Sequence, residues 1–471
     1  MTIVVMKFGG SCLVNKEAFS KILNITKIYS EVKKIYVASA LEGITDLLLK
    51  TANFVNDDKE IDKYMALIEK KHLDIIEQIF IEDSENYTKV KDWLDDKLSE
   101  LEDTFSDIKE FGLEPYYKDY ILSFGEILST YILNQYLLNN GIDSVYIPAN
   151  KLIITNDEFN NAYPLYNLTN ARIKNLLIPI LENPNKDIIV CLTGFIGRNK
   201  IGYITTLGRG GSDYTSTILA RSLYEVGNDK NIKVILWKNV DGLLAINPKF
   251  LPQSSLIKNL DYEEAKHIAN FGAKILHPKC LEAIEKHKIP LEIRNFDKPL
   301  EKNFTQISER TDKEQIKGIS VVEFASIITI ISGSMVDVPG VLAKMFKVMS
   351  KNQISVSLVA QSSSEISTSF IVRDEDSKKA LNALKNSEFF SEFFRIKCED
   401  VAVINIIGVK ILENKTKVEI FKALAKKSID VKAISQSHNE LNLSLVIERD
   451  KLIDAINVIH DDLYEEFEHI K

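Results

Sequence analysis

The chain has 471 residues, enough for about three domains of ~150 residues each, and its 45% hydrophobic and 27% charged content is ordinary for a soluble globular protein. Fifty-nine Lys and Arg against 67 Asp and Glu give a net charge of −8, which argues against a general nucleic-acid or anionic-membrane surface. No apolar run approaches the ~18 residues of a membrane span. We therefore expect a cytoplasmic protein with no nucleic-acid or membrane partner, in which a phosphate ligand needs a local basic site. The four cysteines have no CxxC spacing and are expected to be reduced: Cys12, Cys191, Cys280 and Cys398.

Roughly the first 300 residues alternate short β-branched runs with helical patterns. Strands separated by helices predict an α/β sandwich around a largely parallel sheet. The expected strands are Ile3–Met6, Ile35–Ala38, Val145–Ile147, Ile188–Leu192, Ile201–Thr206, Ile232–Trp237 and Leu291–Arg294.

The first expected strand runs into Lys7-Phe-Gly-Gly-Ser11, and a helix is expected to begin near Asn15 or Lys16. A strand, a glycine turn and a helix form the outline of a phosphate cradle, with a lysine to meet a transferring phosphoryl group. The GxxxxGK[ST] pattern and the HRD and DFG elements of protein kinases are missing. By itself such a turn is more often only a tight turn. The candidate backbone donors are the N–H groups of Gly9, Gly10 and Ser11.

Between about Val55 and Tyr117 the pattern changes to charged, amphipathic helix. It fits a solvated helical insertion better than a helical subdomain beside a substrate cleft. One face of the expected helix carries Met65, Ile68, His72, Ile75 and Ile76.

The segment Thr205-Thr-Leu-Gly-Arg-Gly-Gly-Ser-Asp-Tyr-Thr215 leads from a β-like stretch into an amphipathic helix. Ser212 is expected to cap that helix and leave free N–H groups facing a negative charge. Arg209 offers a fork for a carboxylate or phosphate, and Asp213 offers a carboxylate that can hold a lysine or a metal. The segment therefore predicts an anion site. The residues that allow close backbone approach are Gly208, Gly210 and Gly211.

An internal repeat follows in the C-terminal part of the chain. Met345–Val356 aligns without a gap with Ile420–Val431, at an offset of 75 residues, and the preceding Ile327–Ile331 lies over Ala402–Ile406. Each copy is predicted to run strand, helix, strand, strand, helix, the order of a small split-βαβ domain. Glu309–Lys317 is the expected linker.

The order of these motifs resembles that of the aspartate kinases of the amino acid kinase superfamily, and the repeat resembles their paired ACT domains. The resemblance implies a three-layer catalytic domain at 1–308, with its helical insertion at about 55–117, and two α+β ferredoxin-like (ACT) domains at 318–396 and 397–471. It leaves no room for a homoserine dehydrogenase half. The motifs that carry it are Lys7-Phe-Gly-Gly-Ser11, Gly43-Ile-Thr45, Ser123-Phe-Gly-Glu126, Gly194-Phe-Ile-Gly197, Thr205–Thr215, Val240-Asp-Gly242 and Phe271-Gly-Ala-Lys-Ile-Leu-His-Pro278.

The resemblance implies formation of 4-phospho-L-aspartate from L-aspartate and ATP with Mg²⁺, the first step of the lysine, threonine and methionine pathway. Because phosphoryl transfer to a carboxylate brings two anions together, the site must neutralise charge and align the reactants. The resemblance places Lys7 on the ATP phosphates and gives Asp213 the task of orienting it or helping to place Mg²⁺. It assigns Glu126 to the substrate ammonium and Arg209 to a carboxylate. The remaining substrate-binding residues implied are Ser39, Thr45, Phe195 and Ser212.

For the nucleotide, the resemblance points to the loop after Ile232–Trp237 and to the later Phe-Gly-Ala-Lys turn. His277 is expected to be a structural turn residue, because the attacking carboxylate is already ionised and needs no base. Five positions depart from the family pattern, mostly at the nucleotide edge: Cys12, Leu41, Asn239, Leu244 and Asn247. The residues assigned to the nucleotide are Gly9, Gly10, Ser11, Gly210, Gly211, Lys238, Asn239, Lys249 and Lys274.

Paired ACT domains imply an amino-acid effector, lysine or threonine, and a homodimer or higher homo-oligomer. The second copy has Glu413-Asn-Lys-Thr416 where the first has Asp337-Val-Pro-Gly340, so it is expected to keep the pairing role and to lose the ligand. Dimerisation modules without an effector are the alternative. The implied effector contacts are Met335, Asp337, Val338, Gly340, Val341, Leu342, Ser355, Val356, Gln361 and Glu365.

Two rival functions are considered. Another amino acid kinase, acting on glutamate or a carbamate, would lack this order of motifs followed by ACT-like copies. A catalytically degenerate kinase fold that only senses amino acids is suggested by the altered nucleotide edge. Retention of Lys7, Glu126, Arg209 and Asp213 argues against the sensor.

Overall fold

The computed structural model describes residues 2–183, 187–270, 276–309, 316–333, 338–392, 394–438 and 440–464. The chain divides into two compact units, and each is described by itself. The first comprises Met1–Leu243, Lys258–Tyr262 and Ile275–Glu309, and the second comprises Leu244–Ile257, Glu263–Lys274 and Arg310–Lys471. Two short segments that the sequence analysis placed in the catalytic domain therefore cluster with the C-terminal part of the chain. The predicted domain boundaries stay a prediction.

The first unit is built on an eight-stranded sheet with the order β3-β4-β2-β1-β7-β9-β10-β8. Neighbouring strands run parallel except β9 and β10, which are antiparallel. The central strands β1 and β2 are buried along their whole length, as a parallel sheet covered on both faces requires. This confirms the predicted α/β class. The strand bounds are β1 Ile3–Phe8, β2 Lys33–Ala38, β3 Ser144–Ile147, β4 Ile189–Thr193, β7 Ile232–Lys238, β8 Asn259–Leu260, β9 Leu291–Asn295 and β10 Thr305–Ile307.

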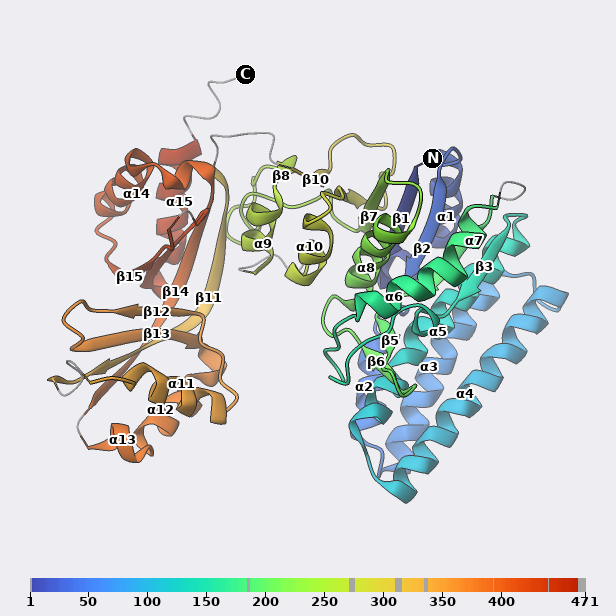
Figure 1. Ribbon diagram of the computed structural model, residues 1–471, viewed down its shortest axis with the longest axis horizontal. Coiled ribbons are helices and arrows are strands. Elements are labelled where there is room, and N and C mark those ends of the chain that lie inside the picture. The colour runs from blue at the N-terminus through green and yellow to red at the C-terminus, as the bar shows by residue number, and fades with distance from the viewer. Residues whose placement is uncertain are drawn as a thin grey trace. The chain divides into compact units, whose positions relative to one another are not determined.

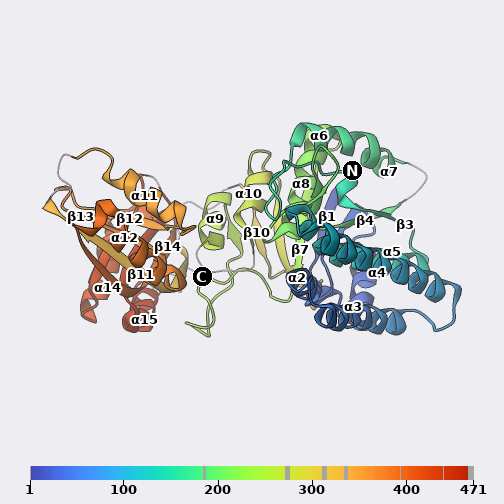
Figure 2. The ribbon, with the colours of Figure 1, turned by 90° about the horizontal axis from the view of Figure 1, so that it is seen from below.

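Helices cover both faces of this sheet. Figure 2 shows α6, α7 and α8 on one side and α2, α3, α4 and α5 on the other, so the unit has the three layers that were expected. Asn15 caps the first helix by accepting a hydrogen bond from the N–H of Ala18, which confirms the predicted helix start. The helix bounds are α1 Lys16–Ile28, α2 Ile44–Asn53, α3 Asp58–Ile79, α4 Glu85–Phe111, α5 Pro115–Asn139, α6 Tyr166–Arg172, α7 Ile178–Leu181, α8 Gly211–Val226 and α10 Pro278–Glu285.

One expected strand is shorter than predicted. Only Ile204–Thr206 (β6) is extended, and it pairs antiparallel with β5, Ile196–Arg198, in a separate two-stranded sheet. The turn between them is closed by the side chain of Asn199, which accepts hydrogen bonds from the N–H groups of Gly202 and Tyr203, both at 2.9 Å. The β-branched Ile201 is therefore left on a turn, and it is 77% exposed.

The interpretation of residues 55–117 as a solvated insertion is wrong for its inner face. The predicted apolar face of α3 is buried, and it joins α4, α5 and side chains of β1 and β2 in one core cluster. His72 lies in this core with Nδ1 2.7 Å from the carbonyl oxygen of Ile68, and burial lowers its pKa to about 4. The long helices of Figure 1 thus extend the core on one side of the sheet.

The second unit carries the repeat. Its sheet has six antiparallel strands in the order β12-β13-β11-β14-β16-β15. The strands β13 (Ser367–Arg373) and β16 (Asn442–Glu448) are 75 residues apart at both ends, which confirms the predicted offset. The other elements are α9 Tyr262–Asn270, β11 Ile316–Ile331, α11 Val341–Lys351, β12 Leu358–Gln361, α12 Asp374–Lys385, α13 Glu388–Ser391, β14 Arg395–Gly408, α14 Asn414–Lys426, β15 Val431–Ser435 and α15 Leu452–Tyr464.

The strand β11 is shared by both copies of the repeat. From Ile316 to Val322 it pairs with the second half of β14, whereas from Ala325 onward it pairs with the first half of β14 and with β13. The register shifts between Val322 and Ala325. The end of the expected linker is therefore strand, because Ile316 and Lys317 already belong to β11.

Within the described ranges, no helix has both the length and the apolar character needed to cross a bilayer.

Candidate active site

Two lysines emerge at the same edge of the large sheet. Lys7 lies near the end of β1 and Lys238 is the last residue of β7, and these strands are parallel neighbours in the sheet. Carboxyl ends of parallel strands meet at one edge, where α/β folds place their ligands. The fold therefore delivers two ammonium groups to one place from positions 231 residues apart in the chain.

The two lysines share one carboxylate. Nζ of Lys7 lies 2.9 Å from Oδ1 of Asp213, and Nζ of Lys238 lies 2.7 Å from Oδ2 of the same residue. The side chains of Lys7 and Asp213 are only 8% and 6% exposed. Lys7 is therefore a buried lysine at the end of its strand. Two positive charges on one carboxylate leave the cluster with a net charge of about +1, which favours an anionic ligand.

The protonation of the cluster follows from burial and charge together. Burial alone would raise the pKa of Asp213, but Lys238 and Lys7 outweigh it and hold the pKa at about 2. Burial opposes the charge of Lys7, yet Asp213 prevails and raises its pKa above the ordinary value. For Lys238 burial dominates, supported by repulsion from Lys7, and its pKa is lowered. Asp213 and Lys7 are therefore charged at neutral pH.

Asp213 lies in the first turn of α8, which begins directly after the glycine-rich turn. The N-cap is Gly210, at φ 71°, and it is followed by Gly211, so Ser212 lies inside the helix and the prediction that it is the cap is wrong. No side chain caps the helix. Its first-turn N–H groups and its dipole therefore favour negative charge beside Asp213.

Glycines let the backbone segments of the site approach one another closely. A Cβ on Gly194 would lie 2.6 Å from both Cβ and Oγ of Ser212, and a Cβ on Gly10 would lie 2.8 Å from the carbonyl oxygen of Ala40. Gly210 packs against His277, whose Cβ would be 2.8 Å from an added methyl group. His277 is itself the N-cap of α10, which agrees with its expected structural role.

Glu126 is buried on α5 and is only 3% exposed. Burial raises the pKa of Glu126 to about 8, although the Ala40 backbone, Lys7 and the Ser212 side chain partly oppose this. None of the described residues donates a hydrogen bond to its Oε2. A buried carboxylate oxygen without a donor is suited to accept one from a ligand, because leaving it unpaired is costly.

The remaining substrate-binding candidates are placed unequally. Phe195 has φ 67°, its N–H donates to Oγ1 of Thr215 at 2.9 Å, and its ring packs partly buried against the core. Ser39 is partly buried directly after β2. Thr45, in the first turn of α2, and Arg209, in the glycine-rich turn, are exposed.

The nucleotide candidates divide between the two units. The turn after β1 is a single 3₁₀ turn, Gly10–Cys12, and a Cβ on Gly9 would lie 3.3 Å from Nζ of Lys7. Asn239 is exposed in the first unit. Lys249 belongs to the second unit, where it is exposed and pairs with Glu323 of β11. Lys274 lies outside the described residues.

The positions that depart from the family pattern are also divided between the two units. Cys12 is buried with Sγ 3.7 Å from the carbonyl oxygen of Trp237, and burial raises its pKa to about 11. Leu41 is buried in the core of the first unit. Leu244 and Asn247 lie in the second unit. All four cysteines are free, as expected.

Of the described effector candidates, Val338 to Leu342 lie at the start of α11, and the others follow this helix in the chain. Gly340 is its N-cap, at φ 88°. The side chains of Val341, Leu342 and Val356 pack in the core cluster of the first copy and are engaged there. Met335 and Asp337 lie outside the described residues. The candidates with exposed side chains are Val338, Ser355, Gln361 and Glu365.

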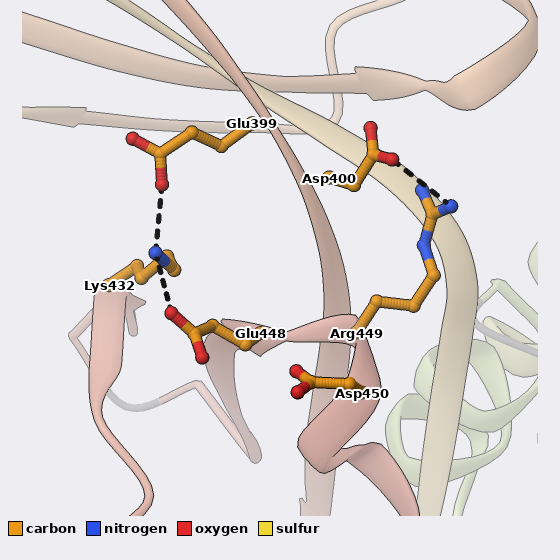
Figure 3. Close-up of a pocket in the computed structure, with 6 residues that line it drawn as sticks. All are labelled: Glu399, Asp400, Lys432, Glu448, Arg449 and Asp450. Carbon is orange, nitrogen blue, oxygen red and sulfur yellow. Dashed lines mark hydrogen bonds and ion pairs between the residues drawn. The ribbon is translucent and has the colours of Figure 1, made fainter.

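The second unit also has a charged surface pocket (Figure 3). Nζ of Lys432 lies 2.8 Å from Glu399 and 3.2 Å from Glu448, and Arg449 lies 3.6 Å from Asp400. Both cations of the pocket thus already have carboxylate partners, and no predicted effector contact lines it. The lining residues are Glu399, Asp400, Lys432, Glu448, Arg449 and Asp450.

One buried charge near the site was missed in the sequence. Asp119, on α5, has no exposed surface and accepts hydrogen bonds from the N–H groups of Thr206 and Asn160. Its spacing of seven residues from Glu126 was the available signal, because residues two helical turns apart share a face.

Comparison with known protein families agrees with this geometry. The model of the amino acid kinase family matches residues 2–295, and an ACT domain model matches residues 328–387 and 404–463. The bifunctional aspartokinase/homoserine dehydrogenase of Buchnera aphidicola subsp. Acyrthosiphon pisum (strain APS) is 29% identical over 98% of this chain, which spans 56% of that relative. Aspartokinase 1, chloroplastic, of Arabidopsis thaliana is 29% identical over 98% of this chain and 80% of the relative.

Solved structures show the same fold. Aspartokinase III of E. coli in complex with aspartate and ADP (R-state) superposes with a TM-score of 0.80 at 24% identity, covering 98% of this chain and 100% of that one. The same enzyme in complex with lysine and aspartate (T-state) also gives 0.80 at 24% identity, with 98% and 99% covered. The family model covers more than half of the chain, and the ACT model covers both copies of the repeat. The chain belongs to the amino acid kinase family and carries a pair of ACT domains.

Proposed function

We propose that this protein is an aspartate kinase, which transfers the γ-phosphoryl group of ATP to the side-chain carboxylate of L-aspartate and forms 4-phospho-L-aspartate. The observation that carries the proposal is the Lys7–Asp213–Lys238 cluster. It lies at the carboxyl ends of β1 and β7, beside the glycine-rich turn that precedes α8. The names of the full-length relatives support the choice of substrate. The intact cluster speaks against the degenerate sensor, since binding alone needs no such charged centre.

Phosphoryl transfer to a carboxylate requires that the negative charge of both reactants is neutralised and that the reacting atoms are aligned. The γ-phosphoryl group and the attacking carboxylate are both anions, so Lys7 and Lys238 reduce their repulsion and stabilise the charge that spreads over the phosphoryl oxygens. Asp213 holds both ammonium groups at fixed positions and keeps them apart. The first turn of α8 adds backbone N–H groups and a favourable dipole. No residue has to remove a proton, because the nucleophile is already ionised.

The buried Glu126 is our candidate for the ammonium group of L-aspartate, through its unpartnered Oε2. Arg209 is our candidate for one carboxylate, because its guanidinium can bind two oxygens at once. Ser212, close to Gly194, and Phe195, close to Gly211, would complete the pocket wall. Ser39 and Thr45 are our candidates for hydroxyl donors to the remaining substrate oxygens.

A nucleotide-using kinase implies a divalent metal ion, which we propose is Mg²⁺. Among the described residues, no group of three or more His, Cys, Asp or Glu side chains is placed to hold one. This donor set fits an ion that arrives with ATP and is held by phosphate oxygens and water, with Asp213 as the nearby carboxylate. When bound, the ion would neutralise further phosphate charge.

We also propose feedback inhibition by lysine or threonine at the first ACT copy, assembly as a homodimer or larger oligomer through the ACT domains, and a cytoplasmic location. The ACT models on both copies support regulation by an amino acid. In a two-state account the effector binds one conformation better and shifts the population toward it.

The function is tested by trapping the acyl phosphate with hydroxylamine. The purified chain is incubated with ATP, Mg²⁺ and L-aspartate, and hydroxamate is measured; L-glutamate replaces aspartate in a parallel reaction. We expect hydroxamate from aspartate, little from glutamate, and a reduced yield with lysine or threonine. Absence of hydroxamate from aspartate would contradict the proposal, and binding of amino acids without any hydroxamate would identify a sensor.

A further inference from the structure

We propose that Asp119 is a positioning residue for the amino-acid substrate, because it fixes the glycine-rich turn that carries Arg209 at a set distance from Glu126. The inference rests on the proposed function. It assigns to a residue outside every substrate-binding motif the task of selecting the length of the dicarboxylate.

The carboxylate of Asp119 is satisfied by neutral donors. The N–H of Thr206 donates to Oδ2 at 2.7 Å and its hydroxyl donates to Oδ1 at 3.0 Å. The N–H of Asn160 lies 3.0 Å from Oδ1 and 2.9 Å from Oδ2. No lysine or arginine among the described residues forms an ion pair with this fully buried group, so these hydrogen bonds compensate its removal from water.

The two residues that donate to Asp119 belong to segments next to the glycine-rich turn. One is the strand β6, and the other is the loop that contains Asn160. Thr206 is the last residue of β6, two residues before Gly208, and its carbonyl oxygen accepts from the N–H of Ala162 at 2.9 Å. Gly208 itself lies on the Asn160 segment: an added Cβ would be 2.8 Å from Oδ1 of Asn161 and 3.0 Å from the carbonyl oxygen of Asn160. One carboxylate thus clamps both the strand that enters the turn and the loop beneath it.

Asp119 and Glu126 are joined by a rigid element. They are seven residues apart on α5, so they lie on one face of the helix, about 10 Å apart along its axis. The helix presents one carboxylate to the stem of the Arg209 turn and the other, with its unpartnered oxygen, to the candidate substrate ammonium. It therefore sets the spacing between the group that receives the ammonium and the group that receives a carboxylate.

That spacing decides which amino dicarboxylate fits. Glutamate is one methylene longer than aspartate, and a turn that is free to shift away from Glu126 discriminates less between the two. Asp119→Asn keeps the shape but places an amide donor against N–H donors, so one buried group loses its partner. We expect the KM for L-aspartate to rise about tenfold and the preference for aspartate over glutamate to fall, while the KM for ATP stays within about twofold.

Glu100→Gln is the matched control. Glu100, on α4, accepts hydrogen bonds from Tyr120 and Lys97, so it anchors the next residue of the same helix without touching the glycine-rich turn. We expect this variant to unfold at a lower temperature while the KM for L-aspartate is unchanged. Thr206→Val removes only the hydroxyl bond to Asp119, and its effect on KM should be non-additive with that of Asp119→Asn.

Hydrogen–deuterium exchange of the peptide covering residues 204–211, measured on the intact protein without substrate, gives a readout independent of activity. Faster exchange there in Asp119→Asn but not in Glu100→Gln, together with the selective change in KM for aspartate, supports the inference. Unchanged exchange, an unchanged KM for aspartate, or an equal loss for aspartate and ATP overturns it. If the wild-type chain phosphorylates no amino dicarboxylate, the proposed function fails and substrate positioning fails with it, while exchange still reports whether Asp119 holds the turn.

Discussion

Nζ of Lys238 donates a hydrogen bond of 2.7 Å to Oδ2 of Asp213, and this contact joins the end of β7 to the first turn of α8. The opposite oxygen of the same carboxylate faces Lys7. A carboxylate held between two lysines cannot neutralise both, so the site carries the positive charge that two anionic substrates require. Asp213 therefore positions both lysines and favours their charged forms.

Asp213→Asn should therefore reduce turnover strongly. The amide has nearly the same shape, but it carries no charge and turns a donor toward one of the ammonium groups. We expect kcat to fall about 10²- to 10³-fold, in the range found when one preorganised electrostatic group is lost, with a smaller change in the KM for aspartate. Glu292→Gln is the control, because Glu292 is also buried and pairs with Lys233 and Arg294 on the same sheet. A kcat within threefold of wild type would refute this role of Asp213.

The lowered pKa of Lys238 predicts that activity depends on pH on the alkaline side. Burial and the charge of Lys7 lower its pKa below the ordinary value of a lysine, so on the alkaline side it loses its proton earlier than an exposed lysine. Because the charged form binds phosphates, kcat/KM for ATP should decline at alkaline pH. Lys238→Arg should move that decline to higher pH, since a guanidinium stays charged. Steady-state kinetics between about pH 7 and 10.5 measure this; superimposable alkaline limbs for the two proteins would show that Lys238 is not the group that titrates.

Glu126 predicts proton release on substrate binding. Burial raises its pKa to about 8, so in the free protein it is largely protonated at pH 7. The substrate ammonium stabilises the charged form, and binding should therefore release close to one proton at pH 7 and strengthen as the pH rises toward 8. Calorimetric titration of L-aspartate in buffers of different ionisation enthalpy counts the proton. Glu126→Gln should bind more weakly and release none; equal proton release in this variant would point to another group.

Gly194→Ala should weaken binding of the amino-acid substrate. The new Cβ would lie 2.6 Å from Cβ and Oγ of Ser212 and 3.0 Å from the carbonyl oxygen of Ala38, so the start of α8 must shift. We expect the KM for aspartate to rise about tenfold or more, because a small misplacement of binding groups is costly. Gly333→Ala is the control, since no atom of the residues that the structure describes lies within 4 Å of its added methyl group. Wild-type kinetics for Gly194→Ala would mean that the contact is not needed for function.

Gly340→Val tests the regulatory loop. Gly340 has φ 88° before α11, a conformation in which a β-branched residue is strained by about 1–2 kcal/mol. We expect the variant to need a higher effector concentration for inhibition, while its uninhibited kcat stays within about twofold, because the population shift depends on effector contacts. Gly141→Val introduces similar strain at φ 75° in the first unit, and it should leave inhibition unchanged. Equal loss of basal activity and inhibition in Gly340→Val would contradict a regulatory role.

Local patterns in the sequence predicted the parts of the fold that are local. The strand order of each repeat copy, the Asn15 cap and the buried face of α3 follow from periodicity and capping chemistry, which act over a few residues. The pairing of Lys238 with Asp213 depends on contacts between distant segments. The spacing from Glu126 places Asp119 on the same helix face, but it does not reveal the distant partners Thr206 and Asn160. Ser212 was misassigned as the cap because two consecutive glycines allow the helix to begin earlier than a side-chain rule expects.

The shared strand β11 has a consequence for how the regulatory unit is made. Its first half, Ile316–Val322, finds its partners in the second half of β14, which ends only at Gly408. During synthesis β11 therefore leaves the ribosome long before the second half of β14. The sheet cannot be fully paired when only the first copy of the repeat has been synthesised. Pairing over such sequence distances is slow and leaves strand edges open in the meantime. The two ACT copies consequently form one folding unit, and a chain cut between them would lose part of the sheet of both.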